Sequence, residues 1–281
     1  MPNEQPFLKG FRMMRIPIVN DKGASAWPEV FPIEKIDRLR ETAGPRYFSS
    51  QMMLEFISED RARLDPGALR FYDGEFNPQM AHIDASMHGN APLQITGIAA
   101  YWDPSSAKDG ADSSVCAIIF RDDKNRRAFI HDIKYLATGA DDLHPFATQC
   151  GRVLDFLGQY GQRNIAIEVN GIGNALPEIL RGAAIAKGRP IAIQKIINRE
   201  NKEKRILDAI EPLLATGRLY AHERVRRTRL IAEMEEWLPV AGANHDDGLD
   251  AVAGALRMTP IAIRPRGQMF LPLRAATDFK V

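Results

Sequence analysis

The sequence predicts an α/β fold in which helices cover both faces of a mixed β-sheet, preceded by an irregular N-terminal extension. Residues 95–136 contain three short apolar stretches separated by polar turns, a pattern typical of an antiparallel meander. From residue 141 to residue 258, segments with helical periodicity alternate with short apolar strands, as in a sheet whose strands are connected by helices. Half of the 18 prolines lie in residues 1–92, where only short periodic pieces occur.

These patterns divide the chain into three parts. They are an extension or linker at residues 1–92, a main domain at residues 93–260 and an irregular tail at residues 261–281. Two short helices are expected in the extension, at 32–42 and 47–56, with loops elsewhere. The main domain is expected to contain strands at 95–102, 115–120, 128–136, 165–170 and 191–197, an extended piece at 218–222, and helices at 141–160, 176–187, 202–215, 228–238 and from about 247.

Composition narrows the class of protein. The 281 residues carry a formal net charge of +1, so binding to nucleic acid would depend on a local basic surface. Cys116 and Cys150 lie in apolar surroundings without the spacing of a zinc site or a disulfide framework, which favours a reducing compartment. We find no signal-peptide pattern and no apolar run of about 18 residues, and therefore expect a soluble, cytosolic protein. The chain has no Gly-x-x-x-x-Gly-Lys-Ser/Thr phosphate loop, which argues against ATP hydrolysis.

An acidic segment stands at the start of the last expected helix. Within six residues it holds His245, Asp246, Asp247 and Asp250. An Asp before a helix can act as a cap, because it accepts from free N–H groups and suits the helix dipole. One Asp is enough for a cap, whereas three clustered acids repel one another unless a cation lies among them, so we prefer a cation site. For His245, a neighbour of the cap and a proton relay both remain open.

Two further acids lie at the ends of expected strands. Asp103 ends the first strand and Glu168 lies near the end of the fourth, and the ends of neighbouring strands lie together at one edge of a sheet. Asp103-Pro104 alone would suit a turn, but Glu168 interrupts an apolar run and needs a partner. Carboxylates gathered in this way suit Mg²⁺ or Mn²⁺, and paired ions can cleave phosphodiesters. There is no histidine cluster for zinc and no Gly-x-Ser-x-Gly elbow for acyl chemistry.

Four of these stretches, in their order and spacing, resemble a known family. They are residues 98–104, which end in Asp103-Pro104, residues 112–114, residues 167–171 around Glu168, and residues 245–251. Together they resemble the nuclease domain of phage terminase large subunits, which has a ribonuclease H-like fold and cuts concatemeric viral DNA during packaging with two divalent ions. Residues 202–206 and 217–220 resemble a helix and a short strand of that domain, and residues 27–32 and 47–51 resemble the segment that follows the packaging ATPase. The resemblance extends from about Arg15 to Met258.

The resemblance implies roles for particular residues and partners. Carried over by position, the catalytic metal ligands are Asp103, Glu168 and Asp247, with Asp246 beside them and Asp112 as a further candidate. Asp250, a turn further into the helix, is expected to be supporting structure. The implied cofactors are two divalent ions, Mg²⁺ or Mn²⁺. The implied partners are double-stranded DNA, the packaging ATPase domain or subunit, the small terminase subunit and the portal, without a membrane, in the cytoplasm of the infected bacterial host rather than in the virion. Because members usually carry the ATPase on the same chain, this chain is either a fragment or one half of a split motor.

Two basic clusters are candidates for contact with DNA phosphates. They consist of Lys202, Lys204 and Arg205, and of Arg224, Arg226, Arg227 and Arg229. A run of charge is often only a solvated face, but four arginines within six residues make a strong local field. Such contacts position a duplex without reading its bases, so low sequence specificity is expected.

The leading interpretation is therefore a metal-dependent DNA endonuclease. Two alternatives stay open on the sequence. One is a junction resolvase or a transposase-like nuclease of the same fold. The other is a non-catalytic docking module, with residues 1–92 bound to an ATPase or portal and the acids purely structural.

Overall fold

The computed structural model describes most of the chain from residue 14 to residue 262. The described residues are 14–20, 22–43, 48–54, 64–84, 93–105, 113–139, 141–170, 175–239 and 245–262. The extension contains α1 (Ile33–Ala43), a π-helical turn η2 (Phe48–Met52), a 3₁₀ turn η3 (Pro66–Ala68) and the short strands β1 (Arg70–Tyr72), β2 (Phe76–Asn77) and β3 (His82–Ile83), and β4 (Leu93–Gln94) begins at the first residue of the main domain. The main domain contains β5 (Gly97–Asp103), β6 (Val115–Asp122), β7 (Arg127–Tyr135), α3 (Pro145–Gln159), β8 (Asn164–Glu168), α4 (Leu176–Ala186), β9 (Ala192–Ile196), α5 (Lys202–Ala215), β10 (Leu219–His222), η5 (Glu223–Arg227), α6 (Leu230–Glu236), α7 (Asp247–Arg257) and β11 (Ile261–Ala262).

A mixed sheet organises the main domain. Its strand order is β1-β10-β7-β6-β5-β8-β9, and β11 pairs with the start of β5. The strands β5, β6 and β7 form the expected antiparallel meander, while β8, β9, β10 and β1 join the sheet in parallel with their neighbours. All strands on this path except β6 therefore run in one direction, and their carboxyl ends meet at one edge. We call this edge the carboxyl edge and the other one the strand-start edge.

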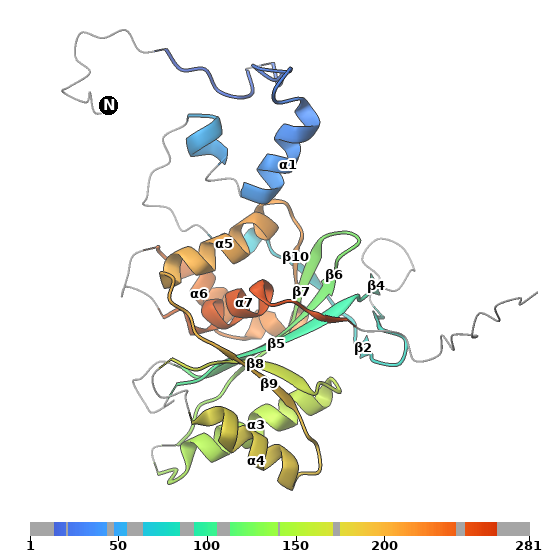
Figure 1. The fold of residues 1–281 in the computed structure, drawn as a ribbon, viewed down its shortest axis with the longest axis vertical. Helices are drawn as coiled ribbons and strands as arrows, with labels where there is room; N and C mark the ends of the chain where they lie inside the picture. The colour runs from blue at the N-terminus through green and yellow to red at the C-terminus, as the bar shows by residue number, and fades with distance from the viewer. Residues whose placement is uncertain are drawn as a thin grey trace, which may run out of the picture.

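Helices cover both faces of the sheet (Figure 1). On one face α7 packs on β5 and β6, with α5 and α6 beside it, and on the other face α3 and α4 lie together. Each interface has an apolar core: Val252 and Ala255 of α7 belong to one core with Ala117, and Val153 and Leu157 of α3 belong to the other with Ile118. The mixed sheet with helices on both faces is the predicted fold class.

The element predictions succeed best in the main domain. The helix predicted at 202–215 has the bounds of α5, and the strands of the meander are displaced by two residues or fewer at each end. Pro145 stands in the first turn of α3, so that helix begins later than predicted. The helix predicted at 228–238 is wrong at its start, because η5 and Thr228 precede α6.

The extension contributes more structure than the sequence predicts. Three residues, Arg70–Tyr72, form β1 and extend the main sheet beside β10. Strands β2, β3 and β4 make a small separate sheet, and Val19, Ile36 and Phe48 form a small apolar cluster. The helix predicted at 47–56 is reduced to the η2 turn within the described residues. Among the described helices, none combines the length and apolar character that crossing a bilayer requires.

Candidate metal centre

Three carboxylates converge at the carboxyl edge of the sheet. Asp103 is the last residue of β5, Glu168 is the last residue of β8, and Asp250 lies in the first turn of α7. Tyr101 and Trp102 of β5 pair in register with residues 166 and 167 of β8, so Asp103 and Glu168 follow at the same level. One carboxylate oxygen from each of Asp103, Glu168 and Asp250 lies within 4.8 Å of the others. This trio is a candidate metal centre.

The trio carries more negative charge than its surroundings neutralise. Burial raises the pKa of Asp103 well above its usual range, and the nearby Asp250 and Glu168 raise it further. Burial also raises the pKa of Asp250, although Arg205 opposes the shift. The guanidinium of Arg205 lies 2.5 Å from Asp250 and 3.8 Å from Glu168, and the ammonium of Lys202 lowers the pKa of Asp103 without cancelling the rise. A bound cation would relieve this repulsion.

Glu168 is held by three neutral donors. The hydroxyl of Tyr101 donates to Oε2 at 2.8 Å, and the amide of Asn198 donates to the same oxygen at 2.7 Å. The amide of Asn170 donates to Oε1 at 2.7 Å. Asn198 and Asn170 follow β9 and β8 respectively, so the loops at the carboxyl edge orient the carboxylate. A carboxylate fixed in this way keeps its remaining lone pairs directed for a ligand.

The N-terminus of α7 is fixed by α6 and β7. The carboxylate of Glu233 accepts from the Tyr135 hydroxyl at 2.8 Å and from the N–H of Leu249 at 3.0 Å. Glu233 thereby caps α7 from another helix, and burial raises its pKa to about 7. A side chain at Gly248 would meet the Tyr135 hydroxyl and Glu233, so only glycine permits this close approach. Glu233 and Tyr135 therefore set the position from which Asp250 reaches the trio.

Asp246 and Asp247 point to other partners. Asp246 accepts from the indole N–H of Trp237 at 3.2 Å and lies 2.6 Å from the Lys202 ammonium. Asp247 accepts from the N–H of Ser113 at 2.6 Å. Lys202 is also 3.9 Å from Asp247 and 3.8 Å from Asp250, so its ammonium lies among all three acids. The rotation of α7 thus differs from the expectation: Asp250, expected as supporting structure, faces the strand ends.

A sequence signal for Asp250 exists. Asp250 stands between Leu249 and the apolar residues Ala251 and Val252 in a helix that is buried from residue 247 to residue 256. A charge inside such a run needs a partner, by the same reasoning that singles out Glu168. Neither the Glu233–Tyr135 contact nor the two asparagines carry a comparable signal, because they are brought to the centre only by the tertiary fold.

Two further candidates are Asp112, as a ligand, and His245, as a proton relay. Asp112 lies outside the described residues. His245 is exposed and directly precedes Asp246.

The basic clusters divide into buried and exposed members. Arg205 is buried against Asp250 rather than lying on the surface, which corrects its expected role as a phosphate contact. Lys202 faces the acids, and Arg224 is half-buried against Glu75. The cations that are exposed are Lys204, Arg226, Arg227 and Arg229. Of these exposed cations, Arg229 donates to the hydroxyl of Ser113 at 3.3 Å, and the N–H of Ser113 donates to Asp247, so Arg229 lies near the acids.

The donor set fits a hard divalent cation. It consists of carboxylate oxygens alone, and burial followed by repulsion from Asp250 and Glu168 raises the pKa of Asp103. These are the ligands that Mg²⁺ and Mn²⁺ prefer. Asp103, Glu168 and Asp250 are the residues that would hold such an ion.

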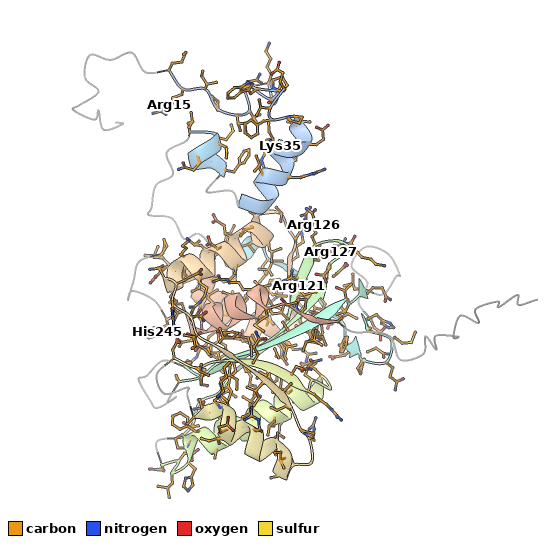
Figure 2. All side chains as sticks on the ribbon, in the orientation of Figure 1. Arg15, Lys35, Arg121, Arg126, Arg127 and His245 are labelled. Atoms are coloured by element: carbon orange, nitrogen blue, oxygen red, sulfur yellow. The ribbon has the colours of Figure 1, made fainter. Side chains whose placement is uncertain are left out.

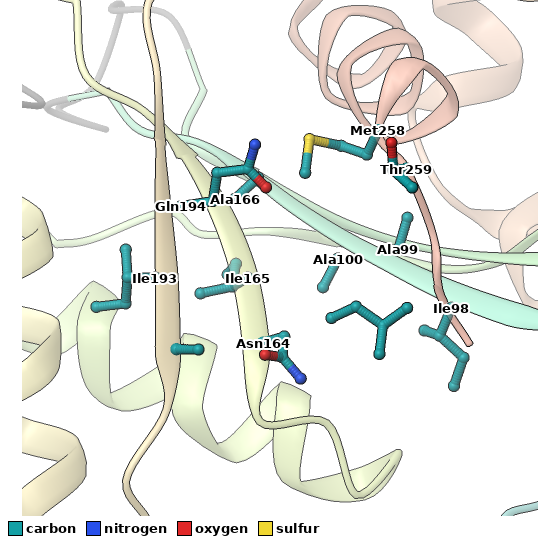
Figure 3. Close-up of a pocket in the computed structure, with 12 residues that line it drawn as sticks. Ile98, Ala99, Ala100, Asn164, Ile165, Ala166, Ile193, Gln194, Met258 and Thr259 are labelled. Atoms are coloured by element: carbon teal, nitrogen blue, oxygen red, sulfur yellow. The ribbon is translucent and has the colours of Figure 1, made fainter. Parts of the chain in front are cut away.

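A cavity of about 210 Å³ lies elsewhere on the sheet (Figure 3). It is lined by β5, β8, β9 and the residues that follow α7, among them Ile98, Ile165, Gln194 and Met258. Its lining contains no acidic, basic or histidine side chain. The cavity therefore takes no part in the carboxylate chemistry.

Comparisons with known proteins show what part of the chain is similar to. Residues 103–219 match the family model described as "Terminase Bacteriophage T7, Ribonuclease H-like domain". Among solved structures, the chain is similar to the nuclease domain of the P22 large terminase, with 10% identity, a TM-score of 0.48, and coverage of 71% of this chain and 92% of that chain. It is also similar to the large terminase of bacteriophage HK97, with 13% identity, a TM-score of 0.44, and coverage of 84% of this chain and 51% of that chain.

A third similar structure is the T. thermophilus RuvC in complex with a Holliday junction substrate, with 15% identity, a TM-score of 0.32, and coverage of 57% of this chain and 90% of that chain. No curated protein matches the sequence. The segment matched by the family model includes Asp103 and Glu168 and ends before α7. The resemblance to the phage terminase nuclease is confirmed over residues 103–219, which match the model of the ribonuclease H-like domain of phage terminases.

Proposed function

We propose that this protein is a divalent-metal-dependent DNA endonuclease that cuts concatemeric viral DNA during genome packaging. The observation that carries the proposal is the trio of Asp103, Glu168 and Asp250, whose ligand atoms lie within 4.8 Å of one another at the carboxyl edge of the sheet. The match of residues 103–219 to a terminase ribonuclease H-like family supports phosphodiester hydrolysis as the reaction. Double-stranded DNA is the proposed substrate, and low sequence specificity is expected because the exposed cations suit phosphate contacts.

Asp103, Glu168 and Asp250 are the proposed ligands of one ion. When bound, divalent ions supply an activated nucleophile and neutralise charge on the phosphate. The donors Tyr101, Asn198 and Asn170 would keep Glu168 in place, and Arg205 would keep Asp250 in place. We retain Asp247 and Asp246 as proposed ligands of a second ion. The Lys202 ammonium lies among these two acids, so their position suits a positive charge. A role for His245 in proton relay and for Asp112 as a ligand likewise remains a proposal.

The biological setting is proposed from the family. In a packaging motor, the nuclease would act with a packaging ATPase domain or subunit, a small terminase subunit and a portal, in the cytoplasm of an infected bacterium. Exposed cations near the centre, Arg229 first among them, are proposed to hold the duplex against the acids.

Plasmid cleavage tests the proposal. Supercoiled plasmid is incubated with the protein and Mn²⁺ or Mg²⁺, and Mn²⁺ binding is measured in parallel by electron paramagnetic resonance. Wild-type protein should give nicked and linear DNA, whereas Asp103→Asn and Asp250→Asn should lose cleavage and bind Mn²⁺ at least about 100-fold more weakly, beyond the effect typical of outer-shell residues. Asp155→Asn on α3, an exposed carboxylate paired with Lys187, is the matched control and should behave as wild type.

Asp247→Asn separates the two groups of acids. If Asp247 serves a second ion, the variant keeps one Mn²⁺ and loses cleavage. Cleavage that persists in EDTA, or that is equal in wild type and Asp103→Asn, would contradict a metal-dependent reaction. Cleavage restricted to four-way junctions would instead support a resolvase.

A further inference from the structure

A second basic surface lies at the strand-start edge of the sheet. It is formed by Arg70, Lys124, Arg126, Arg127 and Arg218, which we call the basic edge. Arg70 begins β1 and Arg127 begins β7, and the carbonyl of Arg218, next to β10, accepts from the N–H of Ala128. Because Leu219 of β10 pairs with Ala128 of β7, Arg218 lies beside Arg127, and Arg70 of β1 pairs with Tyr220, two residues further along β10. Lys124 and Arg126 occupy the turn between β6 and β7.

Two carboxylates, Asp122 and Asp123, stand in the turn of the basic edge. In the turn, Asp122 is buried and accepts from the backbone and side chain of Asn125, so it is used within the turn. Asp123 is exposed and lies 3.8 Å from Arg121. The guanidiniums of Arg70 and Arg127 instead lie about 6 Å from the ring of Tyr220, at 5.9 Å and 6.0 Å. An aromatic ring holds a guanidinium in place while leaving its charge available.

The backbone of the turn provides an independent observation. Arg126 has a φ of +52°, in the left-handed region that favours glycine or asparagine. Such a conformation costs of order 1 kcal/mol for a residue with a side chain, and strain of this kind concentrates at functional sites. Glycine would form the same turn without this strain. The chain nevertheless carries an arginine there, at the exposed tip of the basic edge.

The basic edge is remote from the metal centre. Figure 2 shows Arg126 and Arg127 together on one side of the molecule and His245, beside the acids, on the other. The nine residues of β7 run from Arg127 to Tyr135, and Tyr135 contacts Glu233 near the acids, so the two edges are about 25 Å apart along the strand. Cations at this distance cannot touch the phosphate that the trio would cleave.

We propose that the basic edge binds the sugar–phosphate backbone of a second stretch of duplex DNA, outside the metal centre. The identity of the polyanion rests on the proposed function, in which the substrate is long DNA. Arginine suits this partner because its planar fork donates two parallel hydrogen bonds to a phosphate. The contacts position the duplex and read no bases, and they hold DNA whether or not it occupies the centre.

Binding without cleavage tests the proposal. The Kd for a fluorescein-labelled duplex of about 40 base pairs is measured by anisotropy in EDTA, at several salt concentrations. The double reversal Lys124→Glu with Arg126→Glu should raise Kd at least about tenfold at 0.1 M salt and lower the slope of log K against log salt by about 2. The control is Lys22→Glu with Lys35→Glu, which changes the net charge equally on the exposed surface of the extension and should leave both quantities unchanged.

Arg126→Gly separates binding from folding. Glycine removes the strain at φ +52° as well as the charge, so this variant should be at least as stable as wild type in thermal unfolding while binding the duplex more weakly. A drop in stability together with unchanged Kd would assign Arg126 to structure and overturn the proposal.

The two proposals fail in different ways. If wild type cleaves plasmid but the double reversal binds DNA as the Lys22/Lys35 control does, the basic edge does not contact DNA and serves an acidic protein or solvation. If wild type neither cleaves nor binds the duplex, both proposals are wrong. If it binds through the basic edge without cleaving, the nuclease proposal fails and the DNA contact stands.

Discussion

At the scale of single residues, His131 shows how one inserted residue changes what a strand presents. In the pairing of β6 with β7, Ile118 lies opposite Asp132 and Ile119 opposite Ile130, so His131 is the extra residue of a β-bulge. The bulge directs both His131 and Asp132 towards α3. The His131 ring packs against Phe120 with centroids 4.4 Å apart, and Asp132 accepts from the hydroxyl of Tyr160.

The buried ring predicts acid sensitivity. Burial, with the nearby His222 and Arg224, lowers the pKa of His131 from 6.5 to about 2. Below pH 6.5 the imidazole binds a proton in the unfolded chain but stays neutral in the native state. The free energy of unfolding therefore falls by about 1.4 kcal/mol for each pH unit between pH 6.5 and pH 2. Above pH 6.5 this group leaves the free energy of unfolding unchanged. Urea unfolding between pH 4 and pH 6 gives the free energy of unfolding as a function of pH. The slope of that plot should be smaller for His131→Phe than for wild type by up to about 1.4 kcal/mol per pH unit.

The exposed His144 supplies the control. His144→Asn should retain the wild-type slope, because it replaces a solvent-exposed histidine and leaves the buried ring of His131 in place. An unchanged slope in His131→Phe would mean that the native state accommodates the charged ring.

The acids of the metal centre differ in how far the sequence could predict their positions. Asp103 and Glu168 could be placed together because strand direction and alternation follow from local pattern, and both end adjacent parallel strands. The choice among Asp246, Asp247 and Asp250 could not be made, because it depends on the rotation of α7. Asp246 and Asp247 instead contact Trp237, Ser113 and Lys202, and the contacts with Ser113 and Lys202 join segments far apart in sequence.

At the scale of elements, α7 is the part whose docking decides the geometry of the centre. It is buried from Asp247 to Leu256 between the sheet and α5 and α6, so its position is fixed by packing more than by helix propensity. Its N-terminus is fixed by Glu233 and Tyr135, which require the absence of a side chain at Gly248.

Gly248→Ala should therefore damage the centre. The new Cβ would lie 2.6 Å from Glu233 Oε2 and closer still to the Tyr135 hydroxyl, so α7 must shift. Overpacking of this kind costs about 1–3 kcal/mol, and the displaced Asp250 should weaken Mn²⁺ binding as well. Chemical denaturation and Mn²⁺ titration measure the two effects separately.

A helical glycine with free space is the matched control. A Cβ at Gly151 of α3 would have no neighbour within 4 Å, so Gly151→Ala should stabilise the protein by up to about 1 kcal/mol and leave Mn²⁺ binding unchanged. Adding Tyr135→Phe to Gly248→Ala removes the hydroxyl that obstructs the methyl group and should recover part of the Mn²⁺ affinity. If Gly248→Ala alone binds Mn²⁺ as wild type does, the position of α7 does not depend on this contact.

At the scale of the whole molecule, the extension and the main domain share their apolar cores. Leu64 and Leu69 are buried in the core beneath α7, and Tyr72 and Ile83 are buried in the core beneath α3. The sequence does not predict this, because β1 is three residues long and its contacts are with strands far along the chain. Periodicity cannot detect so short a strand, and proline content alone suggests a linker.

Two truncations test how much of the extension belongs to the fold. A chain that begins at residue 93 lacks β1 and all four of these buried side chains, each worth about 1.5–3 kcal/mol when fully buried. Their sum is comparable with the whole stability of an ordinary domain, about 5–15 kcal/mol, so this chain should unfold at far lower urea concentration or fail to fold. A chain that begins at residue 64 keeps β1 and loses the separate cluster of Val19, Ile36 and Phe48, so its unfolding midpoint should stay close to that of the full chain. Equal midpoints for the two truncated chains would show that the main sheet is complete without β1, and the boundary at residue 93 would then be the right one.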